Sequence, residues 1–568
     1  MQSPIISFRN FSFRYNAQKR PTLEHIDLDI LPGQKVLIVG PSGSGKSTLG
    51  NCINGLIPAS YPGDIAGTLT VDGVDAPKAG VFELSAHVGT VLQDPDGQFI
   101  GLTVGEDIAF SLENNCVEQA EMKQTVADAA RLVDVDGLLQ MAPHELSGGQ
   151  KQRVSLAGVM VNRAPILLFD EPLANLDPAT GKQAIELIDE ICEREHCTAI
   201  IIEHRLEDVL WRHVDRIVLM ADGRIAADTD PETLLSGQLL RDNGIREPLY
   251  CTALRYAGVT LTPEKLPSHP DTLLLNDADR AAVQRWFREA DRPAPADDSP
   301  VMLEVQGLSF SYTGEKKTLE NISFAVRRGE MVSIVGRNGA GKSTLAKLIC
   351  GFEKPDAGVI RLEGRDITRD TIRQRAAVIG YVMQNPNQMI SKSMIREEVA
   401  LGIRNAGYSE EEIESRVENA LKICGLYPFR NWPVSALSFG QKKRVTVASV
   451  LVMGPKVIIL DEPTAGQDFR HYTEIMEFLR ELNRQGVTVI MITHDMHLML
   501  EYTPRAVVIT DGRLLADRRS AGVLCDGQLA EQAALKQTSL FTLAEKCGIG
   551  DPVRFTECFV RYDREVRS

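Results

Sequence analysis

The 568-residue sequence lacks the features of a membrane-spanning or secreted protein. It contains no run of about 18 apolar residues, so we expect no segment that crosses a bilayer. Its first residues, MQSPIISFRN, show no basic region followed by an apolar stretch, so we expect no secretory signal. The ten cysteines are scattered with no pair spaced C-x-x-C, which argues against a metal cluster or a disulfide framework.

A basic excess is also absent. Lys and Arg number 62 against 77 Asp and Glu, which gives a formal net charge of −15. A free-standing nucleic-acid-binding protein usually has the opposite balance, so we expect no nucleic-acid partner. Aromatic residues are sparse at 6%, whereas the 43% hydrophobic and 24% charged fractions are ordinary for a globular protein. A chain of this length is expected to form several domains.

One set of motifs occurs twice in the same order. GPSGSGKST at 40–48 and GRNGAGKST at 336–344 both fit the phosphate-loop pattern G-x-x-x-x-G-K-[ST]. Further pairs follow: LSGGQKQRV (146–154) with LSFGQKKRV (437–445), and ILLFDEP (166–172) with VIILDEP (457–463). The repeated unit is far longer than a solenoid repeat, so this pattern indicates a duplicated domain. The first copy has a longer connection, which we place at 56–67.

Apolar, β-rich runs lead into these motifs. KVLIVG (35–40) and MVSIVG (331–336) run into the two phosphate loops, and the residues after each loop have a helical pattern. We therefore predict an α/β fold with two tandem P-loop NTPase domains, each with a mainly parallel sheet core. The expected limits are domains at 1–240 and 301–530, a linker at 241–300 with a helix at 277–290, and a C-terminal tail at 531–568.

The phosphate loops predict nucleotide binding by the backbone. Glycines allow successive N–H groups to surround a phosphate, and the helix N-terminus adds partial positive charge. Lys46 and Lys342 are expected to reach the β- and γ-phosphates, and Ser47 and Ser343 to ligate Mg²⁺. The loop residues expected to bind nucleotide are Gly40, Ser42, Gly43, Gly45, Lys46, Ser47 and Thr48, and Gly336, Asn338, Gly339, Gly341, Lys342, Ser343 and Thr344.

Paired acidic residues end the second apolar run of each copy. Asp170 and Asp461 are candidate Mg²⁺ ligands, and the following Glu171 and Glu462 are candidate general bases that polarise the attacking water. Two solvated acids at a strand end are the alternative interpretation. Each pair follows an LSGGQ-type motif by a short helix, which favours the functional interpretation.

The LSGGQ motif between a phosphate loop and an acid-ended strand resembles the ATP-binding cassette (ABC) ATPases over about 1–240 and 301–530. This resemblance implies ATP and Mg²⁺ as cofactors, a helical subdomain in each domain, and two cassettes that pair within one chain. Each bound ATP would be capped by the other cassette's signature. Ser147, Gly149 and Gln150 would face the nucleotide on Lys342, and Ser438, Gly440 and Gln441 the nucleotide on Lys46. Phe439 replaces the first glycine of the second signature, so the two sites are expected to be unequal.

Other positions match the family residue by residue. Gln93 and Gln384 match the Q-loop glutamine that touches Mg²⁺ or water, and His204 and His494 match the switch histidine that contacts the γ-phosphate. Asp177 and Asp468 match the D-loop aspartate. Tyr15 and Tyr312 match the aromatic residue that stacks on adenine, with a strand-core aromatic as the competing interpretation for both tyrosines.

The segments after Gln93 and Gln384, QDPDGQFIGLTVGEDIAF and QNPNQMISKSMIREEVALG, resemble the energy-coupling-factor (ECF) importer ATPases of the cobalt or thiamine-precursor type. That resemblance implies a groove for the coupling helices of a transmembrane T component, and a separate S component that captures the solute. The chain would then power uptake of a vitamin, a vitamin precursor or a metal ion, from the cytoplasmic face of the cell membrane.

Two other functions stay open. An ABC-F-type translation factor also carries two cassettes, but usually with a long, charged helical linker that residues 241–300 do not resemble. Ribosome co-sedimentation would distinguish it. The ATPase of a non-ECF importer, such as the fused sugar-uptake type, often has a degraded second site, whereas both motif sets are complete here. The sequence does not name the solute.

Overall fold

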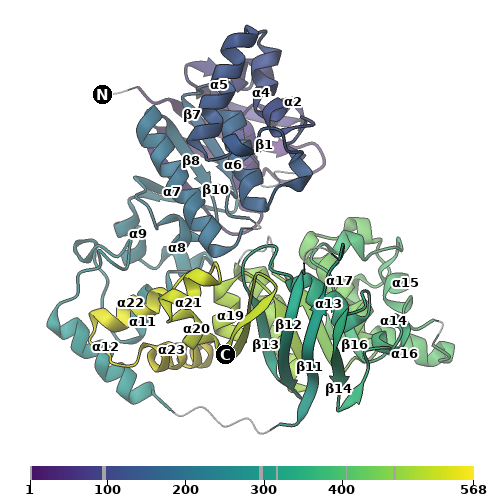
Figure 1. Cartoon of the computed structure of the whole chain (residues 1–568). Coiled ribbons are helices and arrows are strands. Elements are labelled where there is room, and N and C mark those ends of the chain that lie inside the picture. Colours follow the sequence, from purple (N-terminus) through teal and green to yellow (C-terminus); the bar gives the residue numbers. More distant parts are fainter. Residues whose placement is uncertain are drawn as a thin grey trace. The chain divides into compact units, whose positions relative to one another are not determined.

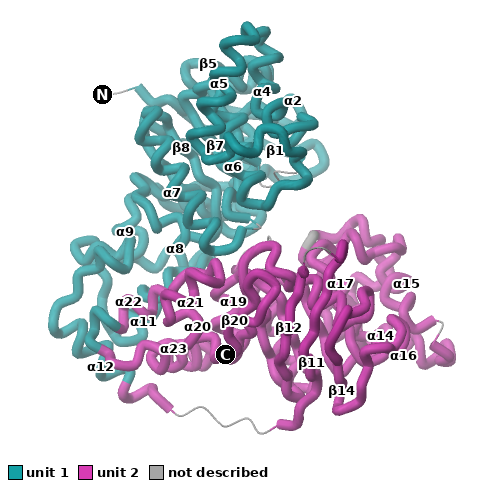
Figure 2. Tube along the Cα trace, viewed as in Figure 1, with its two compact units in different colours: residues 1–287, 545–548 teal, residues 288–544, 549–568 magenta. Residues whose placement is uncertain are grey.

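The computed structural model describes residues 3–92, 97–174, 176–292, 299–314, 317–404, 406–464 and 469–567, with the backbone alone at residues 439, 470 and 471. The chain forms two compact units (Figure 2). Unit 1 comprises residues 1–287 and 545–548, and unit 2 comprises residues 288–544 and 549–568. Each unit contains one copy of the repeated motifs.

Unit 1 is built on two sheets (Figure 1). A six-stranded sheet has the order β10-β9-β3-β8-β7-β6, in which only β10 is antiparallel to its neighbour. Its strands are β3 (Lys35–Val39), β6 (Val88–Val91), β7 (Ile166–Asp170), β8 (Thr198–Ile202), β9 (Arg216–Ala221) and β10 (Arg224–Thr229). An antiparallel sheet, β2-β1-β4-β5, contains β1 (Ile6–Tyr15), β2 (Leu23–Ile30), β4 (Gly63–Val71) and β5 (Val74–Asp75).

Unit 2 repeats this topology. Its six-stranded sheet has the order β16-β17-β18-β13-β19-β20, and its antiparallel sheet the order β12-β11-β14-β15. The strands are β11 (Val301–Phe310), β12 (Leu319–Arg327), β13 (Met331–Val335), β14 (Ala357–Leu362), β15 (Arg365–Asp366), β16 (Ile379–Val382), β17 (Val457–Asp461), β18 (Thr488–Ile492), β19 (Arg505–Thr510) and β20 (Arg513–Arg519).

The helices also repeat between the two units. The phosphate-loop helices are α1 (Lys46–Ile53) and α13 (Lys342–Cys350). A helical group in each unit contains α4 (Val104–Asn114), α5 (Gln119–Leu132) and α6 (Gly148–Met160), or α15 (Ile395–Ala400), α16 (Glu410–Ile423) and α17 (Phe439–Leu451). The others in unit 1 are α2 (Leu56–Ala59), α3 (Val81–Ser85), α7 (Pro178–Glu195), α8 (Leu206–Val209), α9 (Pro231–Ser236), α10 (Leu239–Asp242) and α11 (Leu249–Tyr256). Those beyond are α12 (Asp277–Ala290), α14 (Ile372–Ala376), α18 (Phe469–Arg484), α19 (Met496–Tyr502), α20 (Ser520–Leu524), α21 (Gly527–Gln532), α22 (Ser539–Lys546) and α23 (Pro552–Arg567).

The central strands are apolar because both faces of each sheet are covered. All five residues of β13, β17, β8 and β18 are buried, as are four of the five in β3. Parallel strands covered on both faces favour continuous runs of Val, Ile and Leu over an alternating pattern. The predicted α/β fold, with a mainly parallel core and a helical subdomain in each cassette, is confirmed.

The predicted linker at 241–300 needs correction, because unit 1 extends to residue 287. Helix α11 buries Tyr250, Cys251 and Leu254, and α12 occupies the predicted helix at 277–290. The apolar residues of LYCTALRY supply a packing face that an extended linker would leave in water. Residues 299–300 precede β11, and residues 293–298 of the predicted linker lie outside the described residues.

The predicted C-terminal tail at 531–568 is also folded. It forms α22 and α23, and residues 545–548 belong to unit 1. Lys546 Nζ donates hydrogen bonds to the carbonyl oxygens of Asp271 and Leu273, at 2.6 and 2.9 Å, and Gln284 Nε2 donates to Cys547 O at 2.7 Å. The tail therefore completes the first unit as well as the second.

No helix in the described parts of the chain is both long enough and apolar enough to cross a membrane. All ten cysteines are free thiols, and all but Cys116 are buried.

Arg375 fastens the far end of the phosphate-loop helix in unit 2. Its guanidinium is buried and donates to the carbonyl oxygens of Leu348, Ile349 and Thr368, at 2.6, 2.9 and 2.7 Å. Two of these carbonyls lie in the last turn of α13, where i→i+4 partners run out, although Leu348 O also accepts from Gly351 N at 3.2 Å. Replacing Arg375 by Met should lower the free energy of unfolding by about 2–3 kcal/mol. Urea unfolding of the full chain measures this loss. Arg373→Met, at an exposed position of α14, the helix that also carries Arg375, is the control. Equal stability of the two variants would contradict this role.

Candidate nucleotide-hydrolysis sites

Both phosphate loops lie between the expected strand and helix. The first connects β3 to α1, and the second connects β13 to α13. Gly45 and Gly341 precede the helices with φ of +98° and +97°, and Gly43 and Gly339 also have positive φ. Positive φ at these glycines permits the tight turn that a phosphate-binding loop requires.

The loop lysines lie inside their own loops. Lys46 Nζ donates to Gly40 O at 2.7 Å and Pro41 O at 3.1 Å. Lys342 Nζ donates to Gly336 O at 2.7 Å and Arg337 O at 2.9 Å. Both side chains are buried, so a charged group stands ready where a phosphate would displace carbonyl contacts.

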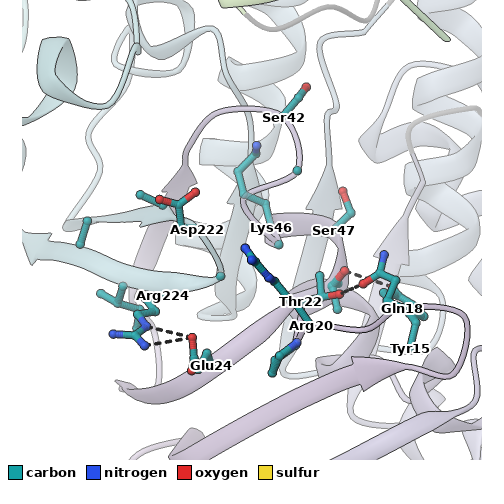
Figure 3. Close-up of a pocket in the computed structure, with 18 of the residues that line it drawn as sticks. Tyr15, Gln18, Arg20, Thr22, Glu24, Ser42, Lys46, Ser47, Asp222 and Arg224 are labelled. Carbon is teal, nitrogen blue, oxygen red and sulfur yellow. Dashed lines mark hydrogen bonds and ion pairs between the residues drawn. The ribbon is translucent and has the colours of Figure 1, made fainter. Parts of the chain in front are cut away.

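A pocket of about 1520 Å³ opens over the first loop (Figure 3). Its lining includes Tyr15, Lys46, Ser47 and Glu171, so predicted adenine, phosphate and metal contacts surround one space. Ser42, Gly43, Gly45 and Thr48 line it too. The pocket also takes in residues without a sequence signal, among them Arg20 and the ion-paired Arg224, whose guanidinium lies 3.0 Å from Glu24.

The strand-ending aspartates lie against the loop serines. Ser47 Oγ donates to Asp170 Oδ1 at 3.4 Å, and Asp461 accepts a hydrogen bond from Tyr381 Oη at 3.0 Å. Burial, with a contribution from Glu171, raises the pKa of Asp170 to about 6. Burial also raises the pKa of Asp461, while hydrogen bonds from Ser343 and Tyr381 work in the opposite direction. A buried carboxylate beside a hydroxyl is the hard oxygen set that Mg²⁺ prefers.

The candidate general bases occupy a strained turn. Glu171 and Glu462 have φ of +51° and +47°, which non-glycine residues rarely adopt. Their N–H groups donate to Ile202 O and Ile492 O, at 2.8 and 2.9 Å. The neighbouring strand therefore holds this backbone, and the strain is characteristic of a site that positions a reacting group.

The two histidines contact these glutamates differently. His494 Nδ1 lies 2.7 Å from Glu462 Oε1, a hydrogen-bond distance. His204 Nδ1 lies 3.7 Å from Glu171 Oε1 and 3.4 Å from Glu203 Oε1. Burial works to lower the pKa of His204, but the charges of Glu203 and Glu171 outweigh it and the pKa is raised. Burial likewise works to raise the pKa of Glu171, yet His204, together with Lys46 and Arg205, outweighs it and that pKa is lowered.

The tyrosines lie beside the phosphate loops. Tyr15 ends β1 and packs against the core, so the strand-core interpretation also fits it, whereas Tyr312 follows the end of β11. Tyr15 Oη lies 3.0 Å from Thr48 Oγ1, and Tyr312 Oη lies 3.4 Å from Thr344 Oγ1. Tyr312 is 54% exposed, whereas Tyr15 is half-buried with the Tyr61 ring 6.5 Å away. Tyr61 belongs to the longer connection of the first copy, so the surroundings of the two tyrosines differ.

The signature serines begin helices. Ser147 Oγ accepts from Gln150 N at 3.4 Å at the start of α6, and Ser438 Oγ accepts from Gln441 N at 3.3 Å at the start of α17. Each glutamine side chain accepts in return from the serine N–H, which completes a capping box. At Gly149 a Cβ atom would lie 2.5 Å from Thr180 Cγ2, so a larger residue there would require Thr180 to shift. Gly440 follows Ser438 in the first turn of α17.

Four further predicted residues remain to be placed. Asp177 is buried and caps α7, accepting from Thr180 N at 2.9 Å. Gln384 follows β16 with an exposed side chain. Gln93 and Asp468 lie outside the described residues.

Sequence reasoning missed two buried charges that support these sites. Glu203 lies before His204 and accepts from the backbone N–H groups of Leu173, His204 and Arg205, at 3.3, 2.8 and 3.2 Å. Lys443 lies in α17, and burial lowers its pKa to about 8. Neither has the same residue in the other copy, where Thr493 and Gln152 stand. A comparison of the copies for differences would have found both.

Comparisons with known proteins agree with this geometry. A family model for ABC transporters matches residues 23–174 and 319–465, and a model described as ATP-binding cassette cobalt transporter matches residues 237–310. The chain is 58% identical over 570 residues to a protein of Enterococcus faecalis named as an ABC transporter ATP-binding protein, with 100% of both chains covered. A relative so named in Clostridium perfringens is 56% identical over 564 residues, with 99% of each chain covered.

A solved structure of cbiO1 from Clostridium perfringens, described as part of the ABC transporter complex cbiONQ, is also similar. It is 36% identical, with a TM-score of 0.39, and the match covers 44% of this chain and 100% of that one.

Glu203 should be a principal support of the first site. Its carboxylate is 1% exposed and accepts three backbone N–H groups, which Glu203→Ala would leave without an acceptor. We expect the free energy of unfolding to fall by about 2–3 kcal/mol, measured by urea unfolding. Glu190→Ala, at an exposed position on α7, is the matched control and should change stability by less than about 0.5 kcal/mol. A Glu203 variant as stable as this control would exclude the supporting role.

Proposed function

From the premise that this chain belongs to the ABC transporter ATP-binding proteins, whose cassettes are ATPases, we propose that it powers an ECF-type importer. Its two cassettes would bind two ATP molecules with Mg²⁺ and drive uptake through a separate membrane component. The solute class is a vitamin, a vitamin precursor or a transition-metal ion. The match of residues 237–310 to the cobalt-transporter cassette model supports this class. The chain would work at the cytoplasmic face of the membrane.

An exposed apolar surface beside the first Q-loop is the observation that carries this proposal. Ile100 is 64% exposed and Leu102 82% exposed, and Phe110 on α4 is 39% exposed. The N–H groups of Ile100 and Gly101 donate to Asp107 Oδ1, at 2.8 and 3.1 Å, so the segment is fastened to α4. Large apolar side chains held outward at neighbouring positions mark a surface for a protein partner.

Unit 2 builds the corresponding segment with a different surface. Glu398 is buried in α15 and accepts from the N–H groups of Ser391 and Lys392, at 2.9 and 2.7 Å. Ser391 and Ser393 stand where the first copy has Ile100 and Leu102. Two fastened segments with unlike surfaces suit a T component with two unlike coupling helices.

The chemistry follows from the sites. Lys46 and Lys342 would turn from the loop carbonyls to the β- and γ-phosphates, and the loop N–H groups would surround them. Ser47 and Asp170, with Ser343 and Asp461 in the second cassette, fit the oxygen set of Mg²⁺, which would neutralise phosphate charge when bound. Glu171 and Glu462 would accept the proton of the attacking water, oriented by His204 and His494.

Pairing of the cassettes is part of the proposal. A serine hydroxyl at a helix N-terminus presents a donor and partial positive charge, which suits a γ-phosphate. Ser147 and Ser438 have this position, so each would cap the nucleotide on the other cassette's loop.

Replacing either proposed general base should stop ATP hydrolysis at its own site. Glu171→Gln and Glu462→Gln keep the side-chain shape but cannot accept the proton, so each should lower kcat for ATP at least tenfold and hold the cassettes in the ATP-bound state. Steady-state phosphate release and retention of labelled ATP measure the two effects. Glu186→Gln, on α7 in unit 1, is the control. Unaltered hydrolysis in both variants would show that the bases are assigned wrongly.

Charge at the apolar surface should break the complex with the membrane component. A tagged chain is purified from its native membranes in mild detergent, and the proteins that accompany it are identified. We expect a multi-span T-type protein and a small S-type protein with the unaltered chain, and loss of both with Leu102→Asp, since a buried charge opposes docking. Leu274→Asp, at a 56% exposed leucine outside this surface, is the control and should retain them.

ATP hydrolysis by the detached Leu102→Asp chain should persist. Retention of the membrane proteins by this variant would remove the surface from the proposal. Ribosomes with the unaltered chain, and no membrane protein, would replace the importer by a translation factor.

A further inference from the structure

Lys443 is a buried lysine within the signature helix of unit 2. It lies in α17, five residues after the N-cap Ser438, and is 2% exposed. Lysine is rarely buried to this extent unless its ammonium is fully paired. Its position in the duplicated motif is that of Gln152 in α6. One copy therefore has a charged group where the other has an amide.

The Lys443 ammonium joins two functional segments. Its Nζ donates to the carbonyl oxygens of Met383 and Gln384, at 3.1 and 2.7 Å, and to Glu462 O at 3.3 Å. An ammonium has three N–H donors, so this geometry occupies all of them. Two bonds hold the segment that carries the Q-loop glutamine, and the third holds the residue proposed as general base.

The third bond completes the support of Glu462. The N–H group of Glu462 donates to Ile492 O at 2.9 Å, and its carboxylate lies 2.7 Å from His494 Nδ1. Lys443 holds the carbonyl oxygen, which is the one remaining polar group of this residue. A displacement of the Q-loop backbone therefore reaches Glu462 through a single side chain.

Gln152 makes a different contact in unit 1. Its Nε2 donates to Pro172 O, one residue beyond Glu171. Its amide is shorter than a lysine side chain and carries no charge, so it does not reproduce the three-way pairing.

We propose that Lys443 is a positioning residue that couples the Q-loop of unit 2 to its general base. Movement imposed on Gln384 by the membrane component would move the Glu462 carbonyl, and with it the carboxylate that orients water. The inference rests on the proposed role of Glu462. It assigns the link between partner and hydrolysis to one cassette, because unit 1 has Gln152 in place of the lysine.

The test compares Lys443→Gln, Lys443→Arg and the unaltered full chain. A glutamine should leave nucleotide binding intact but Glu462 badly placed, so kcat for ATP should fall about threefold or more while KM changes less than about twofold. Arginine, which can donate to the same carbonyls, should restore at least half of kcat. Lys422→Gln, at an exposed lysine on α16, is the matched control and should leave both constants unchanged.

A double variant distinguishes positioning from a structural role. If Lys443 acts through Glu462, then Lys443→Gln should slow a Glu462→Gln chain no further. Multiplied effects, an unchanged kcat, a rise in KM alone, or no recovery with arginine would each overturn the inference. Should Glu462→Gln hydrolyse ATP normally, the proposed base itself would fail. Should it stop while Lys443→Gln is normal, only the coupling would fail.

Discussion

A close approach between loop and sheet governs both sites. A Cβ atom on Gly40 would lie 2.3 Å from Met220 O, and one on Gly336 would lie 1.9 Å from Ile509 O. Glycine is therefore required where each phosphate loop leaves its central strand, since β9 or β19 supplies a carbonyl at that place. The loop, its lysine and the following helix are all fixed against the sheet by this contact.

The carboxyl ends of the parallel strands then collect the remaining groups. β7 and β8 deliver Asp170, Glu171 and His204 to one edge, and β17 and β18 deliver Asp461, Glu462 and His494 to the equivalent edge. Residues far apart in the chain meet there because adjacent parallel strands end together. The sheet topology therefore explains why motifs that occur in the same order along both copies come together as the same kind of site in each unit.

The fold and the phosphate loops were predictable because their signals are local. A strand that ends in GxxxxGK[ST] and continues as a helix is fixed by backbone geometry within about 15 residues. The structure of the region 241–300 was not predictable in this way. Its single helical pattern, at 277–290, stands among prolines and charged residues, and the region packs against Lys546 and Cys547 near the C-terminus. Burial by such distant residues leaves no trace in local sequence.

Glu203 and Lys443 escaped prediction for a related reason. Both lie inside motifs that were identified by what the copies share, whereas these two residues differ between the copies. Their roles arise from buried backbone groups on other segments: three N–H groups around Glu203 and three carbonyls around Lys443. Tertiary contacts of this kind cannot be predicted from the spacing of motifs along the sequence.

The two buried charges also have opposite signs, and this makes the sites electrostatically unlike. Unit 1 adds a carboxylate, Glu203, beside His204, so its histidine is drawn toward the protonated form and its acidic edge becomes more negative. Unit 2 adds an ammonium, Lys443, near Asp461 and Glu462, which offsets their charge before any cation arrives. In unit 1, Lys46 works to lower the pKa of Asp170, but burial and the charge of Glu171 outweigh it, and this pKa rises to about 6. A divalent cation would therefore relieve more carboxylate repulsion in unit 1 than in unit 2. The duplication kept the same motifs in both copies and varied the buried charge around them, so the two copies differ electrostatically although their motif order is the same.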